Sequence, residues 1–398
     1  MSDLLFLAHR VPFPPDRGDK IRSFHILQYL AKRARVHLVA FADDPGDFAP
    51  PAEFTDLLAS CTILPRGKSQ ARAAVEALAT GKPVSLTAFA STAMRAAVDR
   101  LVSAMSGIYC FSGQMAQYLP VDSPPVVMDF VDVDSAKFAG FADDARGPMR
   151  WMMRREARLL GAFERRVAAR VSASLFVSEA EAALFRAGGA EGRILAVENG
   201  IDSVKFDPTA PFEQLPHRHH PGDEGEQAPL IVFTGQMDYR PNIDAVTWFA
   251  RDILPLVRRH HPAHFAIVGR APTPAVQALA GDHVTVTGAV DDVRGWLAAA
   301  DVCAAPLKLA RGIQNKVLEA MAMARPVVAS AAAAEGIDHA DTVHVARSAQ
   351  DFADQVTALL DAPETAAALG NAARAQVIRR YGWDARLAPL DALFGLTA

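Results

Sequence analysis

Short, almost continuous apolar runs alternate with longer stretches of helical periodicity along most of the chain. These runs predict strands at residues 3–8, 36–41, 108–111, 125–130 and 173–178. After residue 228 the alternation starts again, with strands predicted at residues 229–235, 264–269, 283–288, 301–306 and 325–330. Strands that are apolar on both faces are typical of parallel sheets covered by helices on both sides. The pattern therefore predicts an α/β protein with two doubly wound, Rossmann-like domains.

A segment rich in proline, glycine and charge separates the two series of strands and has no apolar periodicity. Such a composition is typical of a linker or a surface excursion. We predict a first domain over residues 1–205, a linker over 206–228 and a second domain over 229–380. The C-terminal residues 381–398 contain an amphipathic pattern that predicts one further helix.

The composition excludes some classes of function. A chain of 398 residues with a net charge of -4 is not typical of a general nucleic-acid binder, which is normally basic. Cys61, Cys110 and Cys303 match no metal-binding pattern, and they predict buried thiols in a reducing compartment. We find neither a secretory leader nor an apolar run near the roughly 18 residues of a spanning helix. We therefore expect a cytoplasmic protein that is at most peripheral to a membrane.

A glycine-containing loop follows the first predicted strand, at the edge where doubly wound sheets bind ligands. Gly18 permits close backbone approach before a helix that is predicted to begin near Asp19. With Lys20 and Arg22 nearby, this helix start is a candidate site for a phosphate or a polar acceptor. The alternative is a solvated helix start. No dinucleotide-binding or P-loop motif occurs in the chain.

Three strands of the second domain also end in glycine, at Gly235, Gly269 and Gly288. Carboxyl ends of parallel strands share one edge of a sheet, so these positions indicate a cleft of cofactor size. Asn242, which follows a proline in the first of these loops, is a candidate helix N-cap.

The loop that follows the strand at 301–306 leads into a helix predicted from about residue 315 to 324, with Lys316 in its first turn. A cation is unfavourable at the positive end of a helix, which suggests that a bound anion compensates it. Glu319 lies three residues further on and shares a face with Lys316. The two are predicted to hold a phosphate and a neighbouring hydroxyl-bearing ring. The alternative is a simple surface ion pair, which suits this largely apolar helix less well.

Two other segments have competing interpretations. The Asp-Val-Asp sequence at 132–134 resembles a metal motif of single-domain nucleotide-sugar enzymes, but it follows a strand of the first domain. We expect Asp132 to cap a helix or contact an acceptor instead. Residues 146–170 form a basic helical pattern, which predicts either a solvated helix face or a contact with anionic lipid or a phosphate-bearing acceptor.

Several of these segments together resemble one family. Residues 312–329 (GIQNKVLEAMAMARPVVA) resemble the donor domain of family-4 retaining glycosyltransferases of GT-B fold. ENGIDSVKF at 198–206 resembles their domain junction, and PPDRGDKIRSFHILQYLA at 14–31 resembles their N-terminal glycine loop. The combination is most similar to the sugar transferases associated with bacterial exopolysaccharide and PEP-CTERM sorting loci.

The resemblance implies two Rossmann-like domains facing a central cleft, with the C-terminal helix returning to complete the first domain. It also implies sugar transfer with retention from a nucleotide-diphosphate sugar to a lipid-linked or saccharide acceptor, usually without a metal or other cofactor. In the second domain, Lys316 would hold the diphosphate, Glu319 the ribose and Val290 would lie near the base. The implied catalytic residues are Lys316, Glu319 and Arg311. The implied donor-binding residues are Gly235, Gln236, Arg240, Gly269, Val290, Gly312, Ile313, Gln314, Asn315, Val317 and Leu318. The implied acceptor-side set is Gly18, Asp19, Lys20, Arg22 and Asp132.

The chain also departs from the family pattern. Arg311 stands where the family has a glutamate that contacts the donor sugar, and Ser112 stands where a histidine is frequent. These departures leave two alternatives open: a nucleotide-sugar epimerase of similar build, and a non-catalytic nucleotide-sugar-binding partner.

Overall fold

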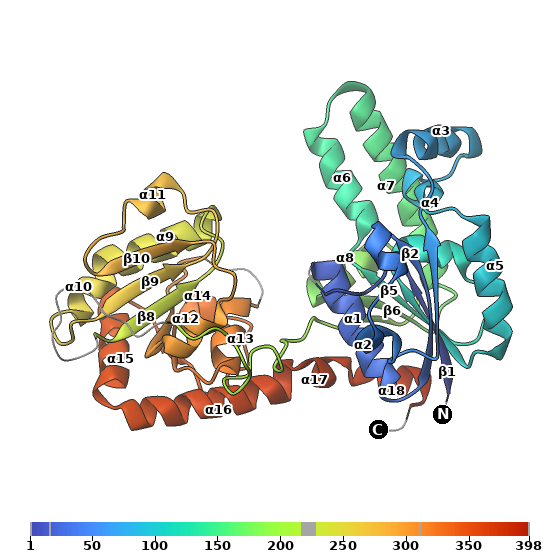
Figure 1. The fold of residues 1–398 in the computed structure, drawn as a ribbon. Coiled ribbons are helices and arrows are strands. Elements are labelled where there is room, and N and C mark those ends of the chain that lie inside the picture. Colours follow the sequence, from blue (N-terminus) through green and yellow to red (C-terminus); the bar gives the residue numbers. More distant parts are fainter. Residues whose placement is uncertain (1, 16, 216–227, 310–312, 397–398) are drawn as a thin grey trace. The chain divides into compact units, whose positions relative to one another are not determined.

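The computed structural model describes residues 2–15, 17–215, 228–309 and 313–396. The chain divides into two compact domains. The first contains residues 1–199 and is completed by the C-terminal residues from Arg386 onward, whereas the second contains residues 200–385. Both are α/β domains built on parallel sheets, as the alternation of strands and helices predicts (Figure 1).

A seven-stranded parallel sheet forms the centre of the first domain, in the order β3-β2-β1-β4-β5-β6-β7. Its strands are β1 (Asp3–Ala8), β2 (Arg35–Ala42), β3 (Ser60–Pro65), β4 (Gly107–Phe111), β5 (Val126–Val131), β6 (Ala173–Phe176) and β7 (Ile194–Ala196). Its α-helices are α1 (Gly18–Ala31), α2 (Ala52–Thr55), α3 (Gln70–Thr80), α4 (Val84–Ala88), α5 (Thr92–Leu101), α6 (Asp134–Asp144), α7 (Gly147–Ala168), α8 (Glu179–Ala187) and α18 (Pro389–Phe394). Three 3₁₀ turns lie at Pro45–Phe48, Val102–Ala104 and Gly113–Tyr118.

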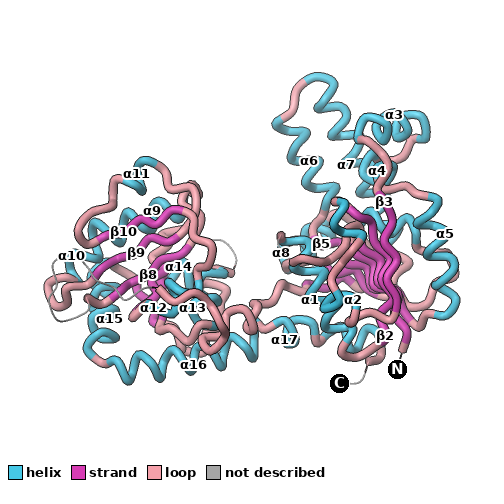
Figure 2. The backbone as a smooth tube through the Cα atoms, viewed as in Figure 1, coloured by secondary structure: helices cyan, strands magenta, loops and turns pink. Residues whose placement is uncertain are grey.

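The second domain contains a six-stranded parallel sheet in the order β10-β9-β8-β11-β12-β13, of which Figure 2 shows β10, β9 and β8 side by side. Its strands are β8 (Leu230–Thr234), β9 (His264–Val268), β10 (Val284–Gly288), β11 (Val302–Ala305), β12 (Val327–Ser330) and β13 (His344–Ala346). Its helices are α9 (Arg240–Trp248), a π-helical turn (Phe249–Ile253), α10 (Leu254–Val257), α11 (Pro274–Gln277), α12 (Arg294–Ala299), α13 (Asn315–Ala322), α14 (Ala331–Ala334), α15 (Ala349–Asp361) and α16 (Pro363–Tyr381). Helix α17 (Trp383–Leu387) spans the boundary between the domains.

The strand order reverses once in each sheet, between β1 and β4 and between β8 and β11. Loops on either side of such a reversal diverge to opposite faces of the sheet and leave a crevice at its carboxyl edge. In the second domain the crevice lies between the loops that lead into α9 and α13. This topology places the predicted lysine helix beside the first glycine loop.

Three strands are missed by the sequence pattern, namely β3, β7 and β13. All three lie at the edge of a sheet, and none of them is fully buried along its length. A strand that is only partly buried lacks the continuous apolar run on which the prediction depends.

The predicted linker is not a separate segment in its described part. Phe206 is buried in the core of the second domain, and Arg374 Nη2 lies 2.7 Å from Asp207 Oδ2. A Cβ at Gly295 would lie 2.4 Å from the carbonyl oxygen of Glu213. Residues 206–215 therefore pack on the second domain, which begins at residue 200 rather than 229.

Each sheet has one buried cysteine in a strand next to its reversal point. Cys110 lies in β4 of the first domain and Cys303 in β11 of the second. Burial raises the pKa of the Cys303 thiol to about 12 and that of Cys110 still further. Cys61, in edge strand β3, is partly exposed.

Candidate functional site

A cavity of about 560 Å³ lies at the carboxyl edge of the second sheet. The loops that follow four of its strands line the cavity, together with the first turns of α9 and α13. The structure brings together most of the residues that the sequence assigned to the donor. These residues are Gly235, Gln236, Gly269, Val290, Ile313, Gln314, Asn315, Lys316 and Glu319.

Lys316 points back across the crevice toward α9. Its Nζ donates a hydrogen bond to Asn242 Oδ1 at 2.6 Å and lies 4.1 Å from the centre of the Phe233 ring. No ion pair links Lys316 to Glu319, both of which the structure describes, so the surface-pair alternative is wrong. Burial lowers the pKa of Lys316 to about 7, because the charged form has lost its water without gaining a carboxylate partner.

Glu319 lies one turn further along α13 and also lines the cavity. Its carboxylate makes no hydrogen bond with any residue that the structure describes. Burial raises its pKa to about 7, against the opposing effect of Lys205 and Lys316. A half-buried lysine and a half-buried carboxylate that form no ion pair are unfavourable for the empty domain, and such groups are characteristic of binding sites.

Two glycines allow the loops of the site to approach one another. A Cβ at Gly269, where φ is +148°, would lie 1.7 Å from the carbonyl oxygen of Gly235. A Cβ at Gly235 would lie 2.8 Å from Asn242 Nδ2 and 3.1 Å from Lys316 Nζ. Side chains at either position would therefore separate the loops or displace the lysine.

Asn242 has a role that the sequence does not indicate. Helix α9 begins at Arg240, so Asn242 is inside its first turn and is not the N-cap. Its Nδ2 donates to the Gln236 carbonyl at 2.9 Å, which fixes the amide so that Oδ1 faces Lys316. The only sequence signal was the position of Asn242 just after a strand-end loop.

Some of the predicted donor residues do not face the cavity. Val317 and Leu318 are buried in the hydrophobic core on the opposite side of α13. Arg240 is exposed and its Nε forms an ion pair with Asp244 at 2.9 Å, one turn along α9. The assignment of Val317 and Leu318 to the donor site is therefore wrong, because their side chains pack in the hydrophobic core of the domain. Arg311 and Gly312 lie outside the described residues.

The predicted acceptor-side residues of the first domain differ in burial: some lie at its surface, and others lie in its interior. Gly18 is the first residue of α1, and Asp19 accepts hydrogen bonds or ion pairs from Arg10, Arg17 and His9. The hydrogen bond from His9 and the neighbouring Arg10 guanidinium hold the pKa of Asp19 well below its usual range. Asp19 therefore remains ionised at the end of β1.

Lys20 and Arg22 lie inside the first domain instead. Lys20 is 4% exposed, 3.5 Å from Asp47 Oδ1. Arg22 is 1% exposed, and it donates to Asp129 Oδ2 at 2.9 Å, to the Val197 carbonyl at 2.8 Å and to Asn199 Oδ1 at 2.9 Å. Every strong donor of Arg22 is thus used within the domain, and the predicted acceptor contact of Arg22 is wrong.

Asp132 is on the surface just beyond β5. The preceding residue, Val131, has φ of +71°, which is rare for a β-branched residue and turns the chain sharply at the strand end. Lys137 Nζ lies 2.6 Å from Asp132 and 3.3 Å from Asp134, so a lysine compensates this acidic pair. Within the described residues, no group of three or more metal-ligating side chains occurs.

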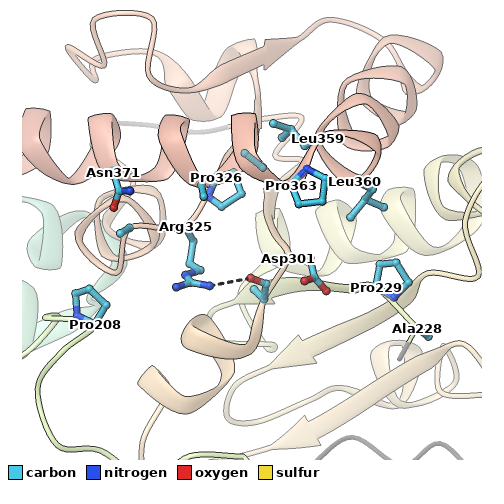
Figure 3. A pocket seen from close by; sticks show the side chains of 14 residues that line it. Pro208, Ala228, Pro229, Asp301, Arg325, Pro326, Leu359, Leu360, Pro363 and Asn371 are labelled. Atoms are coloured by element: carbon cyan, nitrogen blue, oxygen red, sulfur yellow. Dashed lines mark hydrogen bonds between the residues drawn. The ribbon is translucent and has the colours of Figure 1, made fainter. Parts of the chain in front are cut away.

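A second cavity of the same domain, of about 590 Å³, is shown in Figure 3. Its lining includes Pro229, Asp301 and Pro326, each of which directly precedes a strand. This cavity therefore lies at the amino edge of the sheet, where doubly wound folds do not bind their ligands. Its lining is dominated by alanine, proline and leucine, and the carboxylate of its charged pair, Asp301, already accepts a hydrogen bond from the Leu230 N–H at 2.6 Å.

No described helix is long and apolar enough to cross a membrane.

Part of the chain is similar to known proteins in sequence. Residues 228–362 match the family model for glycosyl transferases group 1. A 212-residue segment is 33% identical to a GDP-mannose-dependent alpha-(1-6)-phosphatidylinositol monomannoside mannosyltransferase of Mycobacterium tuberculosis. This segment spans 48% of the present chain and only about half, 53%, of the mycobacterial protein.

Solved structures resemble the chain over nearly its whole length. Sucrose-phosphate synthase of Thermosynechococcus elongatus is 16% identical with a TM-score of 0.56, and covers 99% of this chain and 98% of its own. HepE of Anabaena, solved in complex with UDP and glucose, is 14% identical with a TM-score of 0.53, covering 99% and 100%. At such identities the likeness concerns the fold, which is that of two Rossmann-like domains. The family match is thus confined to residues 228–362, which contain the candidate site, and the solved structures show that the whole chain has the GT-B fold of two Rossmann-like domains.

Proposed function

We propose that the protein is a glycosyltransferase that uses a nucleotide-diphosphate sugar held in the cavity of the second domain. The observation that carries this proposal is the joint placement of Lys316, Glu319 and Gly235 at the reversal point of the sheet, within the family-matched segment. A cavity of about 560 Å³ is in the range of small-molecule and cofactor sites. The mycobacterial relative is by its name GDP-mannose-dependent, and HepE has also been solved in complex with UDP-glucose.

The diphosphate is proposed to lie at the N-terminus of α13. Unpaired backbone N–H groups of a first helical turn bind anions, and Lys316 adds a full positive charge beside them. A bound diphosphate supplies the negative partner that the lysine lacks and raises its pKa, so the lysine is charged when the donor is present. The same charge stabilises the diphosphate as it departs from the sugar.

Glu319 is proposed to accept hydrogen bonds from the ribose hydroxyls, since it faces the cavity one turn beyond the lysine without a partner of its own among the described residues. The base would lie toward Gly269, Arg270 and Val290, which line the cavity on the β9 and β10 side. The sugar is proposed to lie near Ile313 and Gln314, which line the cavity directly before α13.

The acceptor is proposed to be a lipid-linked or saccharide hydroxyl bound by the first domain, and the transfer to retain the anomeric configuration. Asp19 and Asp132, which both lie beyond carboxyl ends of strands, are the acidic groups proposed to contact it. We further propose that no metal is required, since Lys316 and the helix N-terminus supply the positive charge. Activity that is unchanged by a chelator would support this point.

We also propose that the reaction belongs to exopolysaccharide assembly at the cytoplasmic face of the membrane, because of the resemblance to transferases of such loci. This assignment concerns the acceptor and does not affect the donor chemistry.

The test begins with a donor screen by thermal shift, with GDP-mannose and UDP-glucose as the first candidates. The donor that stabilises the protein is then incubated with lipid-linked and saccharide acceptors. Acceptor-dependent release of nucleoside diphosphate supports the transferase. An altered sugar without release would show an epimerase, whereas donor binding without either product, over the full acceptor panel, would contradict catalysis.

A further inference from the structure

The helical hairpin formed by α6 and α7 has an apolar tip. Figure 1 shows the two helices side by side, with their connecting turn at the end away from the sheet of the first domain. Three large apolar side chains lie within about one turn of that connection: Phe141 is 58% exposed, Met149 56% and Trp151 58%. Tryptophan and other large apolar groups on a polar surface are typical of membrane-interface contacts.

A row of arginines extends from this tip along α7. Arg146, Arg150, Arg154 and Arg158 follow one another at intervals of four residues, so they form one stripe along the helix. All four are exposed, and none forms an ion pair or hydrogen bond with a described residue. Arg155 differs, because it donates to the carbonyls of Ala77 and Lys82 and belongs to the packing of the domain.

The stripe borders a groove of about 510 Å³ between α6, α7 and α8. Arg154, Arg158 and Arg165 line the groove together with one acidic residue among those described, Asp143. The remaining lining is small or apolar: Val133, Ser135, Ala136, Ala139, Ala142, Ala157, Gly161, Leu184, Phe185 and Gly188. A positive rim above an apolar floor matches the structure of an anionic amphiphile, which joins a phosphate to a hydrocarbon chain.

We propose that the α6–α7 hairpin docks on an anionic lipid bilayer. Phe141, Met149 and Trp151 enter the interfacial layer, and the four arginines of the stripe contact lipid phosphates. The charge of this surface contrasts with the net charge of -4 of the whole chain, so the attraction comes from the hairpin itself. The site requires no donor sugar, and its test is therefore independent of the proposed transferase activity.

The experiment measures sedimentation of the full-length protein with phosphatidylcholine vesicles and with mixed phosphatidylcholine–phosphatidylglycerol vesicles. We expect binding to the mixed vesicles only, and weakening by added salt. Each exposed arginine that is removed should weaken binding by about five-fold at low salt. Arg150→Gln with Arg154→Gln should therefore lose on the order of 25-fold.

A matched control removes two exposed arginines from the second domain, as Arg251→Gln with Arg259→Gln. This pair changes the net charge equally and should leave vesicle binding within about two-fold of the natural protein. Tryptophan fluorescence provides a second readout, with a blue shift on anionic vesicles that Trp151→Phe abolishes. Circular dichroism confirms that each variant is folded.

The proposal is overturned if the two arginine pairs affect binding equally, or if pure phosphatidylcholine vesicles bind as tightly as mixed ones. It is also overturned if the blue shift persists in Trp151→Phe, because the hairpin tip would then not enter the interface.

Discussion

Lys316 Nζ and Asn242 Oδ1 lie 2.6 Å apart and join the first turns of two helices that follow neighbouring strands of the sheet. The asparagine is held in turn by the carbonyl of Gln236. Because the asparagine amide is neutral, it holds the lysine in place and leaves its positive charge uncompensated. An aspartate carboxylate in the same position would cancel that charge. The lysine is thus positioned before any anion arrives, so less ordering is required on binding.

Lys316→Ala should weaken binding of the nucleoside diphosphate by about 1–3 kcal/mol, the scale of a hydrogen bond to a charged group. Isothermal titration calorimetry measures the effect. Lys68→Ala in the first domain, where Lys68 Nζ pairs with Glu76 at 2.7 Å, is the matched control and should bind normally. Equal affinity of Lys316→Ala and the natural protein would exclude the diphosphate role.

The pH dependence of the same measurement tests the charge of the lysine. Because the pKa of Lys316 is about 7 in the empty site, it is largely deprotonated above that pH and must take up a proton to bind a diphosphate. Affinity should therefore fall as the pH rises from 7 to 9, and this slope should be smaller in Lys316→Ala.

Gly235→Ala should reduce donor affinity while the domain stays folded. The added methyl group would meet Asn242 Nδ2 at 2.8 Å and Lys316 Nζ at 3.1 Å, so it displaces the pair that grips the phosphate. Gly281→Ala is the control, because nothing lies within 4 Å of a Cβ at that position. Calorimetry and thermal unfolding of both variants separate loss of binding from loss of fold. Normal donor binding by Gly235→Ala would show that this close approach is not needed.

Glu319→Gln should stabilise the empty protein at pH 8 and leave its stability unchanged at pH 4. The folded pKa of about 7 lies above the unfolded value of about 4.5, so the glutamate destabilises the fold increasingly between those two values and fully above them. We expect a gain of about 1–2 kcal/mol, reduced from the full shift because the group is partly exposed. Denaturant unfolding at the two pH values measures the gain.

The same Glu319→Gln variant tests the ribose contact. It should lose affinity for a ribonucleoside diphosphate and lose less for the dideoxyribose analogue, which has no hydroxyl for the carboxylate. If both ligands lose affinity equally, Glu319 does not contact the ribose.

Arg22→Met should destabilise the first domain by about 3–5 kcal/mol, because it leaves Asp129 buried without its cation. Asp129 also accepts from Tyr109 at 2.6 Å, so the whole polar cluster is affected. Arg22→Met combined with Asp129→Asn should recover part of the loss. Chemical unfolding measures both, and donor affinity should not change. A mere surface role for Arg22 would instead give a change below about 0.5 kcal/mol.

The fold and the residues of the cavity could be predicted from the sequence to different extents. The central strands are apolar on both faces and were recognisable, whereas β3, β7 and β13 are only partly buried and lack that signal. Lys316 could be recognised because a cation conflicts with the positive end of its own helix. That conflict is local and so is visible in a single sequence.

Contacts between distant segments were beyond the sequence pattern. Asn242 is 74 positions from Lys316, and its function depends on how two loops meet. Arg22 has a polar sequence environment typical of a helix surface, yet Asp129, 107 positions away, provides a buried partner. Nothing in the periodicity of α1 distinguishes a solvated arginine from one that is paired inside the domain.

Cys110 and Cys303 give each domain its own chemical reporter. Both thiols are shielded from alkylating reagents in the folded state, so each reacts only when its own sheet opens. Mass spectrometry of the two modified peptides would therefore record the opening rates of the domains separately in one undivided chain. A nucleotide that binds the second domain should slow labelling of Cys303. The labelling rate of Cys110 then shows whether the stabilisation by the nucleotide also reaches the first domain.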